Sequence, residues 1–175
     1  MRVGIGHDTH RLVDGRPLIL GGVRIDHPRG LYGHSDADVV LHAVADALLG
    51  AAALGDIGEY YPDTDPRWAG LESDRLLAEV VEQVARAGWK PGNCDVIIHA
   101  QAPKLTPHKP AIRANLARLL DLDPSAVNVK AKTGEHVGPV GRAEAIACEA
   151  VVLLVASPVA AAGLWTQDSG LRTQD

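Results

Sequence analysis

Extended and helical segments alternate along this chain, and their order limits the folds that it can adopt. The β-branched run 151–155 is typical of a buried strand, whereas the Ala-, Val- and Leu-rich stretch 36–50 is typical of a helix. The same criteria predict strands at 1–10, 96–98, 127–133 and 143–155, an extended region at 16–25, and helices at 36–50, 73–87 and 111–120. This order predicts an α/β or α+β fold, with a mixed sheet of about four strands and helices on one face.

Composition limits both the core and the partners. The 175 residues are 46% hydrophobic but only 3% aromatic, with no Phe, so the core must be built from Ala, Val, Leu and Ile. A net charge of -5 argues against a nucleic-acid-binding surface. Cys94 and Cys148 lack CxxC spacing and are expected to be buried thiols in a reducing compartment. Without an apolar run of membrane-spanning length, we expect a soluble cytoplasmic protein with no membrane contact. We expect one domain over 1–156, followed by a tail at 157–175.

The first predicted strand carries a carboxylate and an imidazole one residue apart. Because side chains alternate along a strand, Asp8 and His10 project from one face and His7 from the other. Gly4 and Gly6 lie on the Asp8 face and are expected to leave open space beside it. Oxygen and nitrogen ligands suit zinc, so the pair predicts part of a zinc site that needs a further ligand.

The predicted helix at 36–50 offers that ligand. Asp38, His42 and Asp46 are spaced by four residues and therefore share a helical face. Their neighbours are almost all apolar, so these polar groups need partners. His42 would give the site three protein ligands and an open position, and Asp46 would orient the His42 ring. The alternative is a solvated acidic stripe with one surface histidine.

The start of this helix is a candidate anion site. Ser35 is the expected N-cap, with Asp38 three residues later in a weak form of a capping box. Unpaired N–H groups and the helix dipole favour an anion beside such a start. His34 is therefore a candidate donor to a phosphate oxygen, the alternative being a structural cap.

Two loops that follow predicted strands carry residues suited to phosphate groups. Lys104 and Lys132 are candidates to hold phosphates, Thr133 to donate a hydrogen bond, and Glu135 to hold a hard cation such as Mg²⁺. The alternative for each is an ordinary exposed side chain.

Two further features allow both an ordinary and a functional interpretation. The Gly- and Asp-rich loops 55–58 and 61–66 are either plain turns or a lid over a substrate. Arg142 and Glu144 form either a rim salt bridge, a subunit contact or an anion site.

Taken in order, these motifs resemble the 2-C-methyl-D-erythritol 2,4-cyclodiphosphate synthase family of the non-mevalonate isoprenoid pathway. The resemblance covers about residues 1–156. It rests on Asp8-Thr9-His10, His34-Ser35-Asp36, His42, the stretch 46–58, Pro62-Asp63-Thr64-Asp65-Pro66, Gln101-Ala102-Pro103-Lys104, Val129-Lys130-Ala131, Thr133, Glu135, Gly141-Arg142 and Cys148-Glu149-Ala150. The chain departs from the family's usual pattern at His7, Lys132, Gly134 and Pro139.

The resemblance implies a homotrimer around a threefold axis, with active sites between neighbouring subunits. It implies one zinc ion per subunit, held by Asp8, His10 and His42, and a Mg²⁺ or Mn²⁺ ion held by Glu135 and the substrate diphosphate. It implies that His34 and Thr133 are catalytic. The implied substrate contacts are Asp8, His10, His34, Ser35, Asp56, Ile57, Gly58, Tyr61, Asp63, Asp65, Ala100, Pro103, Lys104, Leu105, Ala131, Lys132, Thr133, Glu135 and Arg142.

The implied enzyme is a phosphorus–oxygen lyase. It would convert 4-diphosphocytidyl-2-C-methyl-D-erythritol 2-phosphate to 2-C-methyl-D-erythritol 2,4-cyclodiphosphate and release CMP. Such a step needs two phosphates aligned and relieved of repulsion, and needs no general base. The alternatives are a metal-dependent phosphohydrolase and a non-enzymatic trimeric regulator that binds a nucleotide or a metal.

Overall fold

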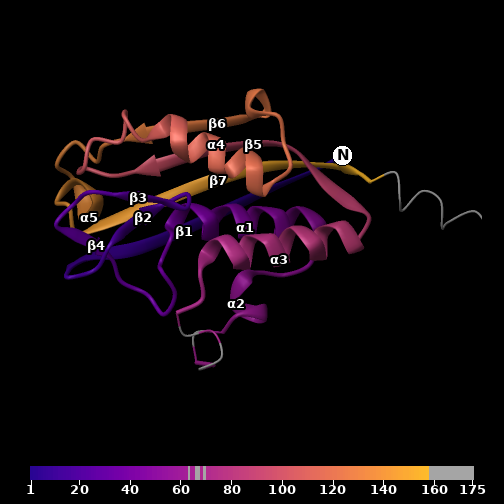
Figure 1. Cartoon of the computed structure of the whole chain (residues 1–175), viewed down its shortest axis with the longest axis horizontal. Coiled ribbons are helices and arrows are strands. Elements are labelled where there is room, and N and C mark those ends of the chain that lie inside the picture. The colour runs from indigo at the N-terminus through magenta and orange to yellow at the C-terminus, as the bar shows by residue number, and fades with distance from the viewer. Residues whose placement is uncertain (63, 66–67, 69, 158–175) are drawn as a thin grey trace, which may run out of the picture.

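A five-stranded mixed sheet forms the centre of the molecule in the computed structural model, which describes residues 1–62, 64–65, 68 and 70–157 (Figure 1). The strands are β1 (Arg2–Asp14), β2 (Leu18–Leu20), β3 (Val23–Ile25), β4 (Arg29–Leu31), β5 (Trp89–His99), β6 (Val127–Lys132) and β7 (Ala145–Ala156). The helices are α1 (Val39–Ala52), α2 (Ile57–Tyr60), α3 (Ser73–Arg86), α4 (Lys109–Leu119), α5 (Gly138–Gly141) and the short 3₁₀ turn Pro124–Ala126.

The sheet has the order β4-β1-β7-β5-β6. Only the β5–β6 pair is parallel among the described strands; β1 pairs antiparallel with β4 and β7, and β7 with β5. The mixed sheet of about four strands is confirmed in outline: the four predicted strands are β1, β5, β6 and β7, and the short edge strand β4 is a fifth, while β2 and β3 form a separate hairpin. The extended region 16–25 breaks at Gly21 and Gly22, which both have positive φ and turn the chain back.

Helices α1, α3 and α4 cover one face of this sheet, as predicted. The space expected beside Gly4 and Gly6 is filled by α1. A Cβ atom on Gly6 would lie 2.0 Å from the Ala43 carbonyl oxygen, and one on Gly4 would lie 2.0 Å from that of Ala47. The two glycines therefore let the backbone of α1 lie directly on β1, which brings residues of the two elements within reach of one another.

The opposite face of the sheet is open in the single chain. Val3 and Ile5 on β1 are 68% and 71% exposed, and Val151 on β7 is 42% exposed. His7 lies on this face, where its Nε2 is 3.0 Å from the Thr9 hydroxyl oxygen. The predicted alternation along β1 is thus confirmed, with His7 pointing away from Asp8.

Helix α1 begins and ends later than predicted. Its N-cap is Asp38 rather than Ser35, and the buried Asp38 carboxylate accepts hydrogen bonds from the N–H groups of Val40 and Leu41. The same carboxylate accepts from Gly21 and Gly22, so it ties the β2–β3 hairpin to the helix. Asp38 therefore satisfies backbone donors and does not share a solvent-facing stripe with His42.

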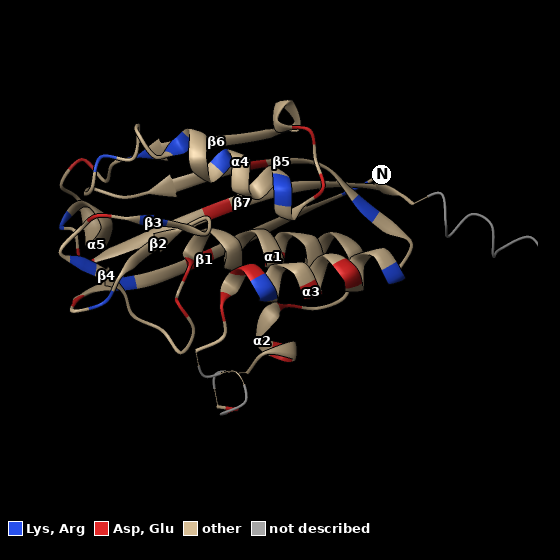
Figure 2. Cartoon of the chain, in the orientation of Figure 1, with Lys and Arg blue, Asp and Glu red and all other residues tan. Residues whose placement is uncertain are grey.

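The other helices agree with prediction to within a few residues: α3 ends one residue early and α4 begins two residues early. Figure 2 contrasts α1, whose one charged residue is Asp46, with α3, which carries acidic and basic residues on its outer side. Cys94 and Cys148 are buried free thiols, as predicted, and burial raises the pKa of Cys94 to about 12. In the described part of the chain, no helix is both long and apolar enough to span a bilayer.

Candidate active site

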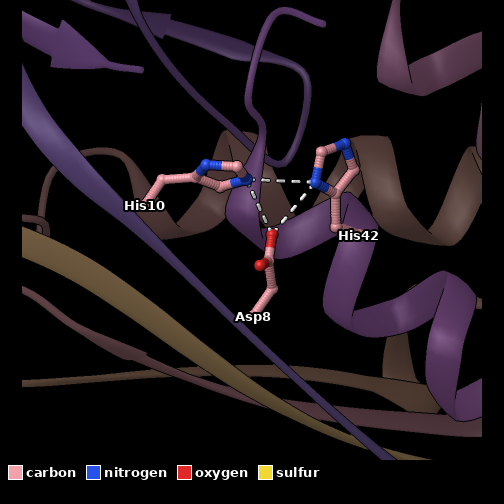
Figure 3. Close-up of side chains that lie close together, drawn as sticks. All are labelled: Asp8, His10 and His42. Atoms are coloured by element: carbon pink, nitrogen blue, oxygen red, sulfur yellow. Dashed lines mark hydrogen bonds and ion pairs between the residues drawn. The ribbon is translucent and has the colours of Figure 1, made fainter. Parts of the chain in front are cut away.

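Asp8, His10 and His42 converge on one point between β1 and α1 (Figure 3). The Asp8 Oδ2 atom lies 3.0 Å from His10 Nε2 and 3.0 Å from His42 Nδ1, and the two nitrogens are 3.3 Å apart. Ligands at about 2.0–2.1 Å from a tetrahedral zinc ion would lie about 3.3–3.4 Å from one another. The three ligand atoms therefore fit the spacing that one zinc ion requires, and the cluster is a possible metal site.

The electrostatics of this cluster favour a cation. Burial alone raises the pKa of Asp8, but the hydrogen bonds and charges of His10 and His42 outweigh it and hold that pKa well below its ordinary value. Burial lowers the pKa of His10, but the Asp8 carboxylate, the Tyr32 carbonyl and the charge of Asp38 together raise it, and the net shift is upward. Asp8 is thus an ionised carboxylate between two imidazoles, and a divalent cation can replace the protons that they share.

Hydrogen bonds from outside the cluster orient both imidazole rings. His10 Nδ1 lies 2.8 Å from the Tyr32 carbonyl oxygen, which directs Nε2 at Asp8. His42 Nε2 lies 3.0 Å from the Ser73 hydroxyl oxygen, which directs Nδ1 at Asp8. Sequence reasoning found neither partner, because nothing in the spacing of residues links Tyr32 or Ser73 to the ligands.

Asp46, which was predicted to orient the His42 ring, makes a different contact in the structure. Its Oδ1 atom accepts a hydrogen bond from the Ile57 N–H at 2.8 Å, so Asp46 holds the loop before α2. One helical turn past His42, its side chain reaches this loop, while the His42 ring turns toward Ser73.

A pocket of about 350 Å³ adjoins His10 and His42. Five further residues predicted to contact substrate line it: His34, Ser35, Ile57, Tyr61 and Asp65. The unpredicted part of the lining is mainly apolar and consists of Tyr32, Gly33, Trp68, Leu71 and Leu76. The pocket thus joins the ligand cluster to a space walled by aromatic and aliphatic side chains, which is typical of small-molecule sites.

Asp56 and Gly58, two other predicted substrate contacts, are not among the residues that line this pocket. Asp56 caps α2 by accepting from the Glu59 N–H at 3.1 Å, and Gly58 lies in the first turn of that helix. Asp63 lies outside the described residues. Ser35, which does line the pocket, also accepts a hydrogen bond from the Ala37 N–H at 3.0 Å in the turn before α1.

The two loops predicted to hold a nucleotide lie side by side at one end of the sheet. Parallel pairing of β5 and β6 sets His99 beside Lys132, and the Ala100 N–H donates to the Lys132 carbonyl oxygen at 2.9 Å. This pairing brings together the predicted residues of both loops, which are Ala100, Pro103, Lys104, Leu105, Ala131, Lys132, Thr133 and Glu135. The Thr133 hydroxyl donates to Glu135 at 2.6 Å.

These loops do not reach the metal pocket within one chain. None of their described residues lines the pocket that adjoins His10 and His42. Arg142 lies apart from it too, in an exposed ion pair with Glu144 at 2.8 Å. The structure therefore gathers the predicted site residues into two groups.

Comparison with known proteins gives a consistent result. The model of the YgbB family matches residues 1–155. The chain is 58% identical over 155 residues to a 2-C-methyl-D-erythritol 2,4-cyclodiphosphate synthase of Synechococcus sp. (strain JA-2-3B'a(2-13)), covering 89% of this chain and 99% of that protein. It is 60% identical over 153 residues to the synthase of the same name from Bordetella pertussis, covering 87% and 94%.

A solved structure shows the same likeness. It is a 2C-methyl-D-erythritol-2,4-cyclodiphosphate synthase in a CDP-bound form, with a TM-score of 0.81 and 42% sequence identity. The match covers 88% of this chain and 100% of that one.

Proposed function

This chain belongs to the YgbB family, and from that premise we propose that it is a 2-C-methyl-D-erythritol 2,4-cyclodiphosphate synthase. It converts 4-diphosphocytidyl-2-C-methyl-D-erythritol 2-phosphate to the cyclic diphosphate and CMP, as a phosphorus–oxygen lyase of isoprenoid synthesis. The observation that carries the proposal is the triangle of Asp8, His10 and His42 beside a pocket of about 350 Å³. The relatives' shared name and the CDP-bound structure supply the substrate class.

Asp8, His10 and His42 hold a zinc ion, and Glu135 holds a Mg²⁺ or Mn²⁺ ion together with the substrate. Bound cations of this kind polarise phosphate oxygens and reduce repulsion between two anionic groups. The zinc assignment is supported by one carboxylate oxygen, two imidazole nitrogens and their spacing of 3.0–3.3 Å. A local set of cations also explains how a protein of net charge -5 binds a polyanion.

The protein's own residues position the reactants. Lys104 and Lys132 bind the cytidine diphosphate, while His34 and the pocket wall hold the methylerythritol phosphate. The 2-phosphate oxygen attacks the β-phosphorus, the bond from that phosphorus to the bridging oxygen breaks, and CMP leaves. His34 and Thr133 donate hydrogen bonds to oxygens on the transferring phosphorus. The attacking phosphate is already ionised, so no residue has to remove a proton.

The working protein is a homotrimer whose active sites lie between subunits. Two observations support this. Val3, Ile5 and Val151 expose apolar side chains on the uncovered face of the sheet, which suits packing against other copies around a threefold axis. The metal pocket and the nucleotide loops also share no described lining residue in one chain, so a neighbour's loops are needed to complete the site.

We place the folded domain at 1–156 and treat 157–175 as a tail, in keeping with a family match that ends at 155. Residues 158–175 lie outside the described part of the chain. The buried free thiols of Cys94 and Cys148 suit a reducing compartment, and we assign the enzyme to the cytoplasm.

Incubation with the cytidine diphospho substrate, Zn²⁺ and Mg²⁺ in ¹⁸O-labelled water tests the reaction. Phosphorus NMR and CMP release should show one cyclic product for each CMP, with no labelled oxygen in that product. A phosphohydrolase would instead place labelled oxygen in inorganic phosphate or in an open-chain product. Binding of the nucleotide without any release of CMP would leave only the regulator.

A further inference from the structure

Ser73 and Asp36 form a partly buried network of hydrogen bonds that ends on His42. The Ser73 hydroxyl is a close donor to Asp36 Oδ1, and its oxygen lies 3.0 Å from His42 Nε2. Ser73 is fully buried, and its N–H also donates to Asp36 Oδ2 at 3.1 Å. One carboxylate therefore holds both donors of the first residue of α3.

The number of protons that each group can donate fixes which group donates in each hydrogen bond of this network. A serine hydroxyl has one proton, and an ionised carboxylate can only accept, so the proton of Ser73 is given to Asp36. The lone pairs of the Ser73 oxygen then remain for His42, whose Nε2 must carry the proton that it donates. With the proton on Nε2 fixed in this way, Nδ1, the atom that faces Asp8 and His10, can offer its lone pair to a cation that replaces the proton shared with Asp8.

The position of Asp36 suits this task. It lies in the loop before α1, whereas Ser73 begins α3, whose own N-cap Glu72 makes no side-chain capping bond. Asp36, although distant in sequence, thus caps the start of α3 and holds Ser73 against α1. Ser35 is a weaker partner of His42, since its hydroxyl oxygen is 3.4 Å from Nε2 and already accepts from the Ala37 N–H.

We propose that Asp36 and Ser73 are positioning residues that hold His42 in the ring orientation and tautomer in which Nδ1 binds the metal. The inference rests on the metal site of the proposed function. Asp36 and Ser73 act through His42 and are not proposed to contact the substrate.

Zinc affinity, measured by competition with a chromophoric chelator and without substrate, tests this role. Ser73→Ala leaves the buried Nε2–H without its acceptor and should weaken zinc binding by roughly 10–100-fold, the usual effect of losing a partner behind a metal ligand. Asp36→Asn is nearly isosteric, and its amide can donate to Ser73 and turn the hydroxyl proton toward Nε2. It should weaken zinc binding by about tenfold.

Asp46→Asn is the matched control. It also removes one negative charge near His42, but in the wild type the Asp46 carboxylate accepts from the Ile57 N–H and does not hold the His42 ring. It should leave zinc affinity close to that of the wild type. In ¹⁵N-labelled zinc-loaded protein, the His42 Nε2–H proton should exchange slowly with water, and Ser73→Ala should make this exchange fast. Thermal melting of the metal-free variants checks that each is folded.

The inference is overturned if Ser73→Ala binds zinc as tightly as the wild type. It is also overturned if Asp46→Asn weakens binding as much as Asp36→Asn does, because a general charge effect would then explain both. A protein that releases no CMP but shows the expected order of zinc affinities would refute the proposed reaction and leave this inference intact.

Discussion

The two groups of predicted site residues are built in different ways. Asp8, His10 and His42 lie where α1 presses onto β1, and each ring is held by a second hydrogen bond from elsewhere in the chain. Lys104 and Glu135 lie on loops beyond the ends of β5 and β6, where both side chains are exposed. The first group brings its three ligand atoms together within one chain. The second can close only around a ligand, a neighbouring subunit or both.

The two groups differ in how much ordering ligand binding requires. A site whose ligand atoms are already 3.0–3.3 Å apart needs little rearrangement to take up a cation. The exposed side chains of Lys104 and Lys132 lose rotamer freedom when they bind a nucleotide, which costs conformational entropy. Single substitutions in the metal group, Asp8, His10 and His42, should therefore have large effects on zinc binding. Binding by the nucleotide group, which includes Lys104 and Glu135, should instead depend on assembly of the subunits.

The largest effect is expected from His42→Ala. Losing one of three ligands should abolish tight zinc binding, and the several kcal/mol that a Lewis acid contributes correspond to about 10³-fold or more in turnover. Binding of CDP, followed by calorimetry, should persist if the two groups are independent. His7→Ala, on the opposite face of β1, is the control and should keep its zinc, as metal analysis would show. Loss of zinc from the His7 variant would contradict the alternation of β1.

Mixing two inactive variants is expected to restore turnover to a level about fourfold below that of the wild type. His42→Ala lacks the metal group and Glu135→Gln lacks the predicted holder of the second cation. In randomly mixed trimers with sites between subunits, roughly a quarter of the sites combine an intact His42 with an intact Glu135 from the neighbour. Coexpression should therefore restore roughly a quarter of the wild-type turnover. If both groups acted within one chain, every site would carry a defect and no turnover would return.

The same contrast shows what the sequence can and cannot predict. Alternation along a strand placed Asp8 and His10 together and His7 apart, since that relation depends only on neighbouring residues. Helical spacing nominated His42, but it also nominated Asp46, whose carboxylate binds the Ile57 N–H. The true partner of His42, Ser73, is thirty-one residues away and meets it only because α3 packs on α1.

The start of α1 was misplaced for a similar reason. Ser35 has the composition of an N-cap, yet Asp38 takes that role because the β2–β3 hairpin delivers two more backbone donors to its carboxylate. Such a contact is tertiary and leaves no local signal. The sequence also missed the fifth strand of the sheet, β4 (Arg29–Leu31), because three residues form a pattern too short to identify.

The smallest effect on catalysis is expected from Asp38→Asn, which tests the support of the metal group alone. The Asn amide nitrogen would face the Gly22 or Gly21 N–H and leave it unpaired, so the free energy of unfolding should fall by about 1–3 kcal/mol. CDP binding should not change, because the nucleotide loops lie elsewhere. Chemical denaturation at several pH values measures the stability difference between the two proteins.

The difference in the free energy of unfolding between wild type and Asp38→Asn should change with pH in a definite direction. Burial raises the pKa of Asp38 from 3.8 to about 6, against the pull of the backbone donors of Gly22, Gly21 and Leu41. A raised folded-state pKa means that the stability contributed by the carboxyl is fully present below 3.8 and is lost as pH rises through about 6. Asn has no proton to lose, so the stability gap between wild type and variant should narrow over this range. A gap that widens as pH rises would mean instead that the backbone donors outweigh burial and that the ionised carboxylate is the form that stabilises the start of α1.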